Sequence, residues 1–123
     1  MSRIVHFELP STNFAASVKF YENVLGWRIE KYEGPMEYYM VYTGENNEPG
    51  INGAIGGPAI DYKGTVNTAD VANIDETLKK VVANGGKIVI PKQEIPNVGV
   101  VAYIQEPGGA ILGVIQQFPN AGM

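Results

Sequence analysis

Two side chains near the start of the chain have types and a spacing that could do chemistry. His6 is the only histidine among 123 residues, and Glu8 follows it two positions later. Because side chains alternate along a β-strand, a strand over about 3–9 would place both groups on the same face. An imidazole and a carboxylate there could transfer a proton to or from a ligand with a carbonyl or hydroxyl group. We therefore predict His6 and Glu8 as catalytic residues.

Simpler interpretations exist for both residues. His6 can be a partly buried histidine retained by packing, and Glu8 can be a carboxylate at the open, wet rim of a cavity. The pKa of His6 distinguishes these cases, because a neighbouring carboxylate would raise it, whereas burial alone would lower it. A lowered pKa would count against His6 and Glu8 acting as a pair.

Tyrosines form a second group of candidates. Tyr38, Tyr39 and Tyr42 fall on one predicted strand, and Tyr103 falls on the equivalent strand of the second half of the chain. An aromatic ring on a cavity wall can stack on a ligand, so we predict Tyr39 and Tyr103 as substrate-binding residues. The sequence leaves open which of Tyr38 and Tyr39 faces the cavity. Ordinary strand packing is the alternative, because aromatic residues are common in strands.

The composition excludes several other classes of chemistry. The chain has no cysteine, which rules out disulfides, thiolate metal ligands and a cysteine nucleophile, and fits a reducing compartment. Its 9 Lys and Arg residues are scattered among 13 Asp and Glu residues, unlike the basic patches that bind nucleic acid. No stretch approaches the roughly 20 apolar residues that span a bilayer. We therefore expect a cytoplasmic protein that binds a small molecule, not nucleic acid or a membrane.

The elements that would position these residues occur twice. Two apolar-periodic runs each end in glycine, at Gly26 and Gly86, which gives an offset of 86 − 26 = 60 residues. The same offset aligns Asn13 with Asn73, each just before its helical run, where a side-chain oxygen can cap free backbone N–H groups. It also aligns the two apolar stretches at 51–55 and 111–115.

Each half of the chain has the predicted order βαβββ. The first module, about 1–57, has strands at about 3–9, 27–33, 36–43 and 50–56 and a helix at about 13–25. The second module, about 61–117, has strands at about 63–69, 87–91, 98–105 and 110–117 and a helix at about 74–84. We predict one α+β domain over 1–123, in which a curved mixed sheet encloses one cavity and a helix covers the outer face of each module.

Several short motifs carry a resemblance to a known family. These are IVH at 4–6, FYENVLGW at 20–27, NGG at 84–86 and EPGG at 106–109. Together they resemble the glyoxalase/bleomycin resistance protein/dioxygenase family, also called the vicinal oxygen chelate superfamily. The resemblance implies paired βαβββ modules that form a half-barrel, often as a homodimer, and in many members a divalent metal.

The resemblance also implies where such a metal would bind. The family takes His or Glu side chains from the first and last strand of each module, and aligned by the 60-residue offset those positions are His6, Gly53, Val66 and Gly113. Three of the four have no donor atom, whereas a catalytic divalent metal usually has about three protein ligands. We therefore predict no metal and no other cofactor, with a divalent metal disfavoured.

The resemblance leaves two functions open. One is a small-molecule-binding protein with lyase-type chemistry, similar to lactoylglutathione lyase, on a substrate with a carbonyl or hydroxyl group. The other is a non-catalytic protein that sequesters a drug or metabolite. The sequence does not decide whether the protein is an enzyme, and the missing metal ligands favour sequestration.

Overall fold

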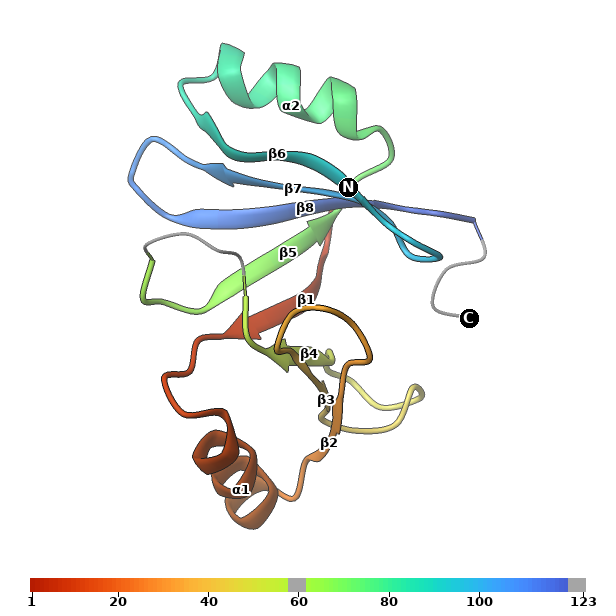
Figure 1. Cartoon of the computed structure of the whole chain (residues 1–123). Helices are drawn as coiled ribbons and strands as arrows, with labels where there is room; N and C mark the ends of the chain where they lie inside the picture. Colours follow the sequence, from red (N-terminus) through yellow and green to blue (C-terminus); the bar gives the residue numbers. More distant parts are fainter. Residues whose placement is uncertain (58–61, 120–123) are drawn as a thin grey trace. The chain divides into compact units, whose positions relative to one another are not determined.

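The computed structural model describes residues 1–57 and 62–119, which contain two helices and eight strands (Figure 1). These residues form two compact units, each described by itself below. The first unit is His6–Val66, and the second unit is Met1–Val5 with Asn67–Met123. The chain order is βαβββ twice, which confirms the α+β class and the paired modules. The single domain with one enclosed cavity stays a prediction, and residue 61, its predicted module boundary, lies outside the described residues.

The first module of the chain folds as a mixed four-stranded sheet with one helix. Its elements are β1 Ile4–Leu9, α1 Phe14–Leu25, β2 Arg28–Lys31, β3 Tyr39–Tyr42 and β4 Gly53–Ile55. The strand order is β2-β3-β4-β1, with β1 parallel to β4 and the other pairs antiparallel. The strands are shorter than predicted at their ends, whereas their number and order agree with the sequence.

The second module repeats this order. Its elements are β5 Val66–Asp70, α2 Ile74–Ala83, β6 Lys87–Ile95, β7 Gly99–Gln105 and β8 Ile111–Gln117, and the strand order is β5-β8-β7-β6. The prediction that the strand after α2 ends at residue 91 was wrong. β6 continues past Pro91 because it is the outer strand of its module and pairs only with β7, through two register shifts. A residue without an N–H is tolerated at such a position.

Both helices begin where the sequence predicts, for the same physical reason. Asn13 Oδ1 accepts the backbone N–H of Ala16 at 3.1 Å, and Asn73 Oδ1 accepts that of Glu76 at 3.1 Å. Each asparagine therefore satisfies one of the free N–H groups at its helix start. α1 ends at Gly26, whose φ of 70° is in the left-handed region that glycine adopts without strain. The helix starts thus follow the 60-residue offset, whereas the prediction that the second helix ends in glycine at Gly86 was wrong, since α2 ends at Ala83 with Asn84 as its C-cap.

The later strands do not follow that offset. Glu8 of β1 pairs with Ala54, and its counterpart Thr68 of β5 pairs with Gly113, so Gly113 corresponds to Ala54 at an offset of 113 − 54 = 59. The assignment of Gly53 as the counterpart of Gly113 was therefore wrong. The loops of the two modules differ in length, and a slip of one residue moves a side chain to the other face of the sheet.

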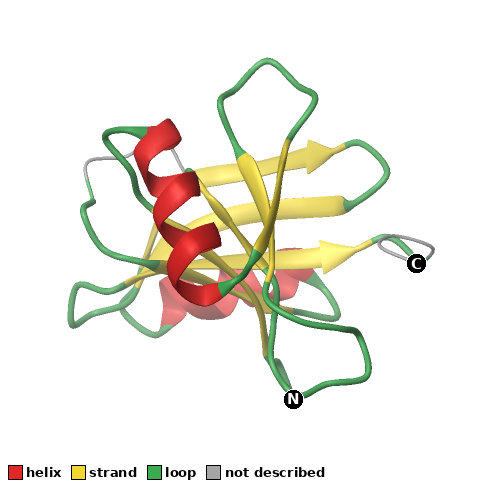
Figure 2. Cartoon of the chain, turned by 90° about the horizontal axis from the view of Figure 1, so that it is seen from below, coloured by secondary structure: helices red, strands yellow, loops and turns green. Residues whose placement is uncertain are grey.

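Side chains alternate between the two faces of each sheet, and the helix of each module packs on one of these faces. In the first unit, Phe7 of β1 packs on Trp27 with ring centroids 6.1 Å apart, and Trp27 stacks on Tyr21 of α1 at 5.1 Å. Phe7 thus lies on the helix side, as predicted, and Glu8 lies on the opposite face. In the second unit Ile74 and Leu78 of α2 form a buried cluster with Ala102, Ile104 and Val114 of the sheet. The two helices are red and the strands yellow in Figure 2.

Candidate functional site

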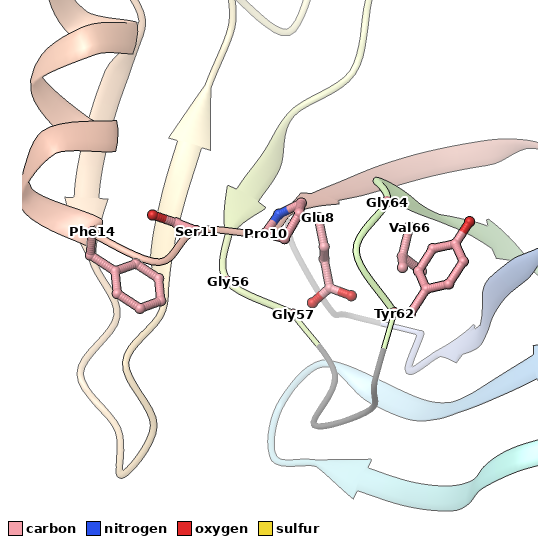
Figure 3. Close-up of a pocket in the computed structure, with 9 residues that line it drawn as sticks. All are labelled: Glu8, Pro10, Ser11, Phe14, Gly56, Gly57, Tyr62, Gly64 and Val66. Carbon is pink, nitrogen blue, oxygen red and sulfur yellow. The ribbon is translucent and has the colours of Figure 1, made fainter.

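The carboxylate of Glu8 lies at a small cavity within the first unit (Figure 3). Glu8 is only 4% exposed, so it is not a carboxylate at a wet rim. The cavity has a volume of about 200 Å³. It is lined by Glu8, Pro10, Ser11, Phe14, Gly56, Gly57, Tyr62, Gly64 and Val66. In Figure 3 the rings of Phe14 and Tyr62 lie on either side of Glu8.

Tyr38 connects the two residues that the sequence predicts as catalytic. Its hydroxyl donates a hydrogen bond to Glu8 Oε2 at 2.8 Å and lies 3.0 Å from His6 Nε2. The Tyr38 hydroxyl thus lies between the imidazole and the carboxylate. A buried carboxylate is costly unless it is hydrogen-bonded, and the phenol supplies one such bond.

The imidazole of His6 is half-buried, and burial lowers its pKa below the ordinary value. This is the direction expected from desolvation, not from a stabilising carboxylate. His6 is therefore a neutral hydrogen-bonding group at neutral pH. The Tyr38 hydroxyl therefore connects His6 with Glu8, and the catalytic role of the two residues stays a prediction.

The sequence left open whether Tyr38 or Tyr39 faces the cavity, and it is Tyr38 that contacts Glu8. Met40 of β3 pairs with Ala54 of β4, and Ala54 pairs with Glu8, so these three side chains share a face. Tyr38 precedes Met40 by two positions and therefore points toward the same face. The signal that could have identified it is this even spacing, which is informative only once the strand register is known.

The two tyrosines that we predicted as substrate-binding residues lie elsewhere. The Tyr39 ring packs on Phe14 of α1 with centroids 5.6 Å apart, and its hydroxyl donates to the exposed Glu37 at 3.3 Å. Tyr103 lies on β7 of the second unit, opposite Gly113 and on the face turned away from α2. Neither residue is among those that line the cavity at Glu8. Their roles in ligand binding stay predictions.

A divalent metal does not fit the positions at which the family binds one. Gly53 lies on the face of Phe7, since a Cβ there would come within 2.6 Å of the Phe7 ring, and the residue beside Glu8 is instead Ala54. A Cβ at Gly113 would lie 2.5 Å from Thr68 Oγ1. Neither glycine position has room for a ligating side chain in this backbone. Within 1–57 and 62–119, no three His, Asp or Glu side chains form a metal-binding group.

A comparison with protein families identifies the chain. The model of the Glyoxalase/Bleomycin resistance protein/Dioxygenase superfamily matches residues 3–114. The chain belongs to this superfamily. A search of curated proteins finds no match. No helix in the described part of the chain is long and apolar enough to cross a membrane.

Solved structures of low sequence identity share the fold. A hypothetical protein from Bacillus halodurans C-125 has a TM-score of 0.74 at 13% identity, with 99% of each chain covered. Methylmalonyl-CoA epimerase from Mycobacterium tuberculosis has a TM-score of 0.70 at 12% identity, covering 94% of this chain and 88% of the epimerase. A superfamily member from Vibrio splendidus 12B01 has a TM-score of 0.66 at 21% identity, covering 96% of this chain and 100% of that protein. At these identities the likeness shows the fold alone.

Proposed function

We propose that this superfamily member binds a small molecule in the cavity of its first unit, with Glu8 as the group that the ligand contacts. The buried Glu8 carboxylate is the observation that carries the proposal. It lines the cavity at 4% exposure and is held by the Tyr38 hydroxyl at 2.8 Å. A few converging polar groups in a cavity are typical of small-molecule recognition.

The size of the cavity limits the ligand. Its volume of about 200 Å³ corresponds to about seven water molecules at roughly 30 Å³ each. This is smaller than the roughly 300–1,000 Å³ of sites for drug-sized ligands. We therefore expect a compact ligand, or the compact end of a larger one, that carries a hydroxyl or carbonyl group.

Binding is tested with hydroxyacetone, which has both groups and fits this volume. The compound is titrated into ¹⁵N-labelled protein, and the backbone amide signals of Gly57 and Gly64 are followed by NMR. We expect these signals to move in the wild-type protein and to move much less in Glu8→Gln, which keeps the shape of the side chain but removes its charge. Shifts of equal size in both proteins, or no shift at these glycines, would contradict the proposal.

A second candidate function is lyase-type or epimerase-type proton transfer. It is favoured by the position of Glu8, a proton acceptor at the cavity. Glu8 would take a proton from the carbon beside a carbonyl, the C–H electron pair would form the C=C bond of an enolate while the carbonyl π pair moves to oxygen, and the proton would then return to carbon. Two similar structures are epimerases that, by their names, act on methylmalonyl-CoA.

Deuterium exchange separates this candidate from sequestration. Hydroxyacetone and methylmalonyl-CoA are incubated with protein in D₂O, and loss of the proton signal beside the carbonyl is followed by NMR. Exchange that is faster than in buffer and absent in Glu8→Gln would support an enzyme. Binding without exchange would support sequestration.

We also propose a homodimer in the cytoplasm. The outer strands β2 and β6 each pair with one strand within their modules, and exposed strand edges are often covered by a partner. The absence of cysteine fits a reducing compartment. Light scattering over a hundredfold dilution should report a mass near twice that of one chain. A mass equal to one chain throughout that range would contradict the dimer.

A further inference from the structure

With Glu8 ionised, the hydrogen bonds around Tyr38 run in one direction. A phenol carries a single hydrogen, and Tyr38 donates it to Glu8 Oε2 at 2.8 Å. The Tyr38 oxygen must therefore accept the hydrogen bond from His6, whose Nε2 lies 3.0 Å away. His6 then carries its hydrogen on Nε2. The three side chains form a donor chain that runs from His6 through Tyr38 to Glu8.

The ring of Tyr38 is held in place by its surroundings. Gly56 lies so close that a Cβ there would come within 2.9 Å of Tyr38 Cδ1. The ring of Tyr32 packs on it edge-to-face, with centroids 6.0 Å apart. Because a rotation of the phenol would break these contacts, its hydroxyl stays directed at Glu8.

We infer that Tyr38 is a positioning residue that fixes Glu8 as a hydrogen-bond acceptor, so that the cavity selects ligands presenting a hydrogen-bond donor. The inference rests on the proposed function, because it concerns the ligand of the same cavity. The favoured class has a hydroxyl, amine or amide N–H at the Glu8 end. Compounds that offer only acceptors, such as ethers and ketones without a hydroxyl, are disfavoured, because an acceptor facing a carboxylate forms no hydrogen bond and repels it.

Reversing these hydrogen bonds would require a different protonation of both Glu8 and His6. It would need a proton on Glu8, and it would need His6 to accept through Nε2 with its hydrogen moved to Nδ1. The low exposure of Glu8 by itself favours a protonated carboxyl, whereas the donated phenol hydrogen stabilises the ionised one. The tautomer of His6 therefore reports which direction the protein adopts.

The first arm of the experiment needs no ligand. His6 is the only histidine, so the ¹⁵N signals of a histidine-labelled sample belong to it without ambiguity. At pH 8 we expect the Nε2–H tautomer in the wild-type protein. Tyr38→Phe keeps the ring but removes the acceptor of Nε2–H, and should move the Nε2 signal. Tyr21→Phe is the control, since Tyr21 stacks on Trp27 on the helix side of the sheet, away from Glu8, and loss of its hydroxyl should leave the Nε2 signal unchanged. The Nδ1–H tautomer in the wild type would overturn the inference.

The second arm compares two ligands that differ in one donor. Hydroxyacetone has a hydroxyl, and methoxyacetone has a methyl ether at the same position. We expect hydroxyacetone to bind at least tenfold more tightly, measured by the amide shifts of Gly57 and Gly64. Tyr38→Phe should weaken hydroxyacetone binding about tenfold, as for the loss of one hydrogen bond to a charged group, and Tyr21→Phe should leave it unchanged.

The outcomes separate the inference from the function on which it rests. Equal binding of the two ketones would overturn ligand selection while leaving binding in the cavity intact. Binding of neither ketone would contradict the proposed function and the selection with it. The tautomer measurement tests the donor chain in the free protein, and its result stands even if Tyr38→Phe does not fold.

Discussion

The two modules have the same order of elements, yet only the first carries the hydrogen-bonded side chains His6, Tyr38 and Glu8. Strand pairing equates His6, Glu8 and Tyr38 of the first module with Val66, Thr68 and Val101 of the second. All three counterparts are buried, at 3%, 4% and 6% exposure, and two are apolar. The repeated backbone therefore supplies a scaffold in both modules, and the candidate site depends on side chains that only the first module has.

Phe7 of the first module and its counterpart Asn67 of the second differ in burial. This difference gives the largest expected effect on the free energy of unfolding. Phe7 contacts Trp27 beneath α1, whereas its counterpart Asn67 on β5 is exposed. Phe7→Ala should lower the free energy of unfolding by about 3 kcal/mol, the lower end for phenylalanine because Phe7 is half-buried. Asn67→Ala should change it by less than about 0.5 kcal/mol. Urea unfolding measures both, and equal losses would show that the helix faces do not differ as described.

Gly113 and its counterpart Ala54 give a second, intermediate effect. Ala54 already carries a Cβ at full burial, whereas a Cβ at Gly113 would lie 2.5 Å from Thr68 Oγ1. Gly113→Ala should therefore lower the free energy of unfolding by about 1–3 kcal/mol, as overpacking does. The loss should shrink in a Thr68→Ala background, where the opposing hydroxyl is gone. A loss of the same size in both backgrounds would exclude this contact as its cause.

His6 gives a smaller, pH-dependent effect that Val66 cannot give. Burial lowers the pKa of His6 in the folded protein, so the unfolded chain binds more protons below the ordinary histidine pKa of about 6.5. The free energy of unfolding should therefore fall as the pH drops below about 6.5, until the lower folded pKa is passed. Glu8 and Tyr38 face His6, so they stay unchanged in the comparison with His6→Gln, which removes this part of the pH dependence. Identical curves for both proteins between pH 8 and 5.5 would refute the assignment.

The smallest expected effect is that of a chelator on either module. The family positions for a metal have one donor, at His6, and lack room for others at Gly53 and Gly113. A metal that binds only the folded state would raise its stability, so removing it would lower the melting temperature. We expect EDTA to leave the melting temperature of the purified protein unchanged. A decrease of several degrees, reversed by added zinc or nickel, would show that a metal binds through other groups.

Local patterns predicted the elements well, because their causes are local. The caps at Asn13 and Asn73 and the left-handed Gly26 define helix ends through bonds within a few residues. Alternation along β1 placed Glu8 and Phe7 on opposite faces. The continuation of β6 through Pro91 could not be predicted in this way, since it depends on the strand lying at the edge of its module.

The sequence by itself therefore determined the βαβββ repeat, the helix starts and the shared face of His6 and Glu8. Only the tertiary structure decided that Tyr38, and not Tyr39, contacts Glu8 and that Ala54, and not Gly53, lies beside it. Helix caps and strand alternation arise from neighbours in the chain, whereas register arises from pairing between distant strands across loops of unequal length. Since side chains alternate with a period of two, a shift of one residue in that pairing decides which tyrosine contacts the carboxylate.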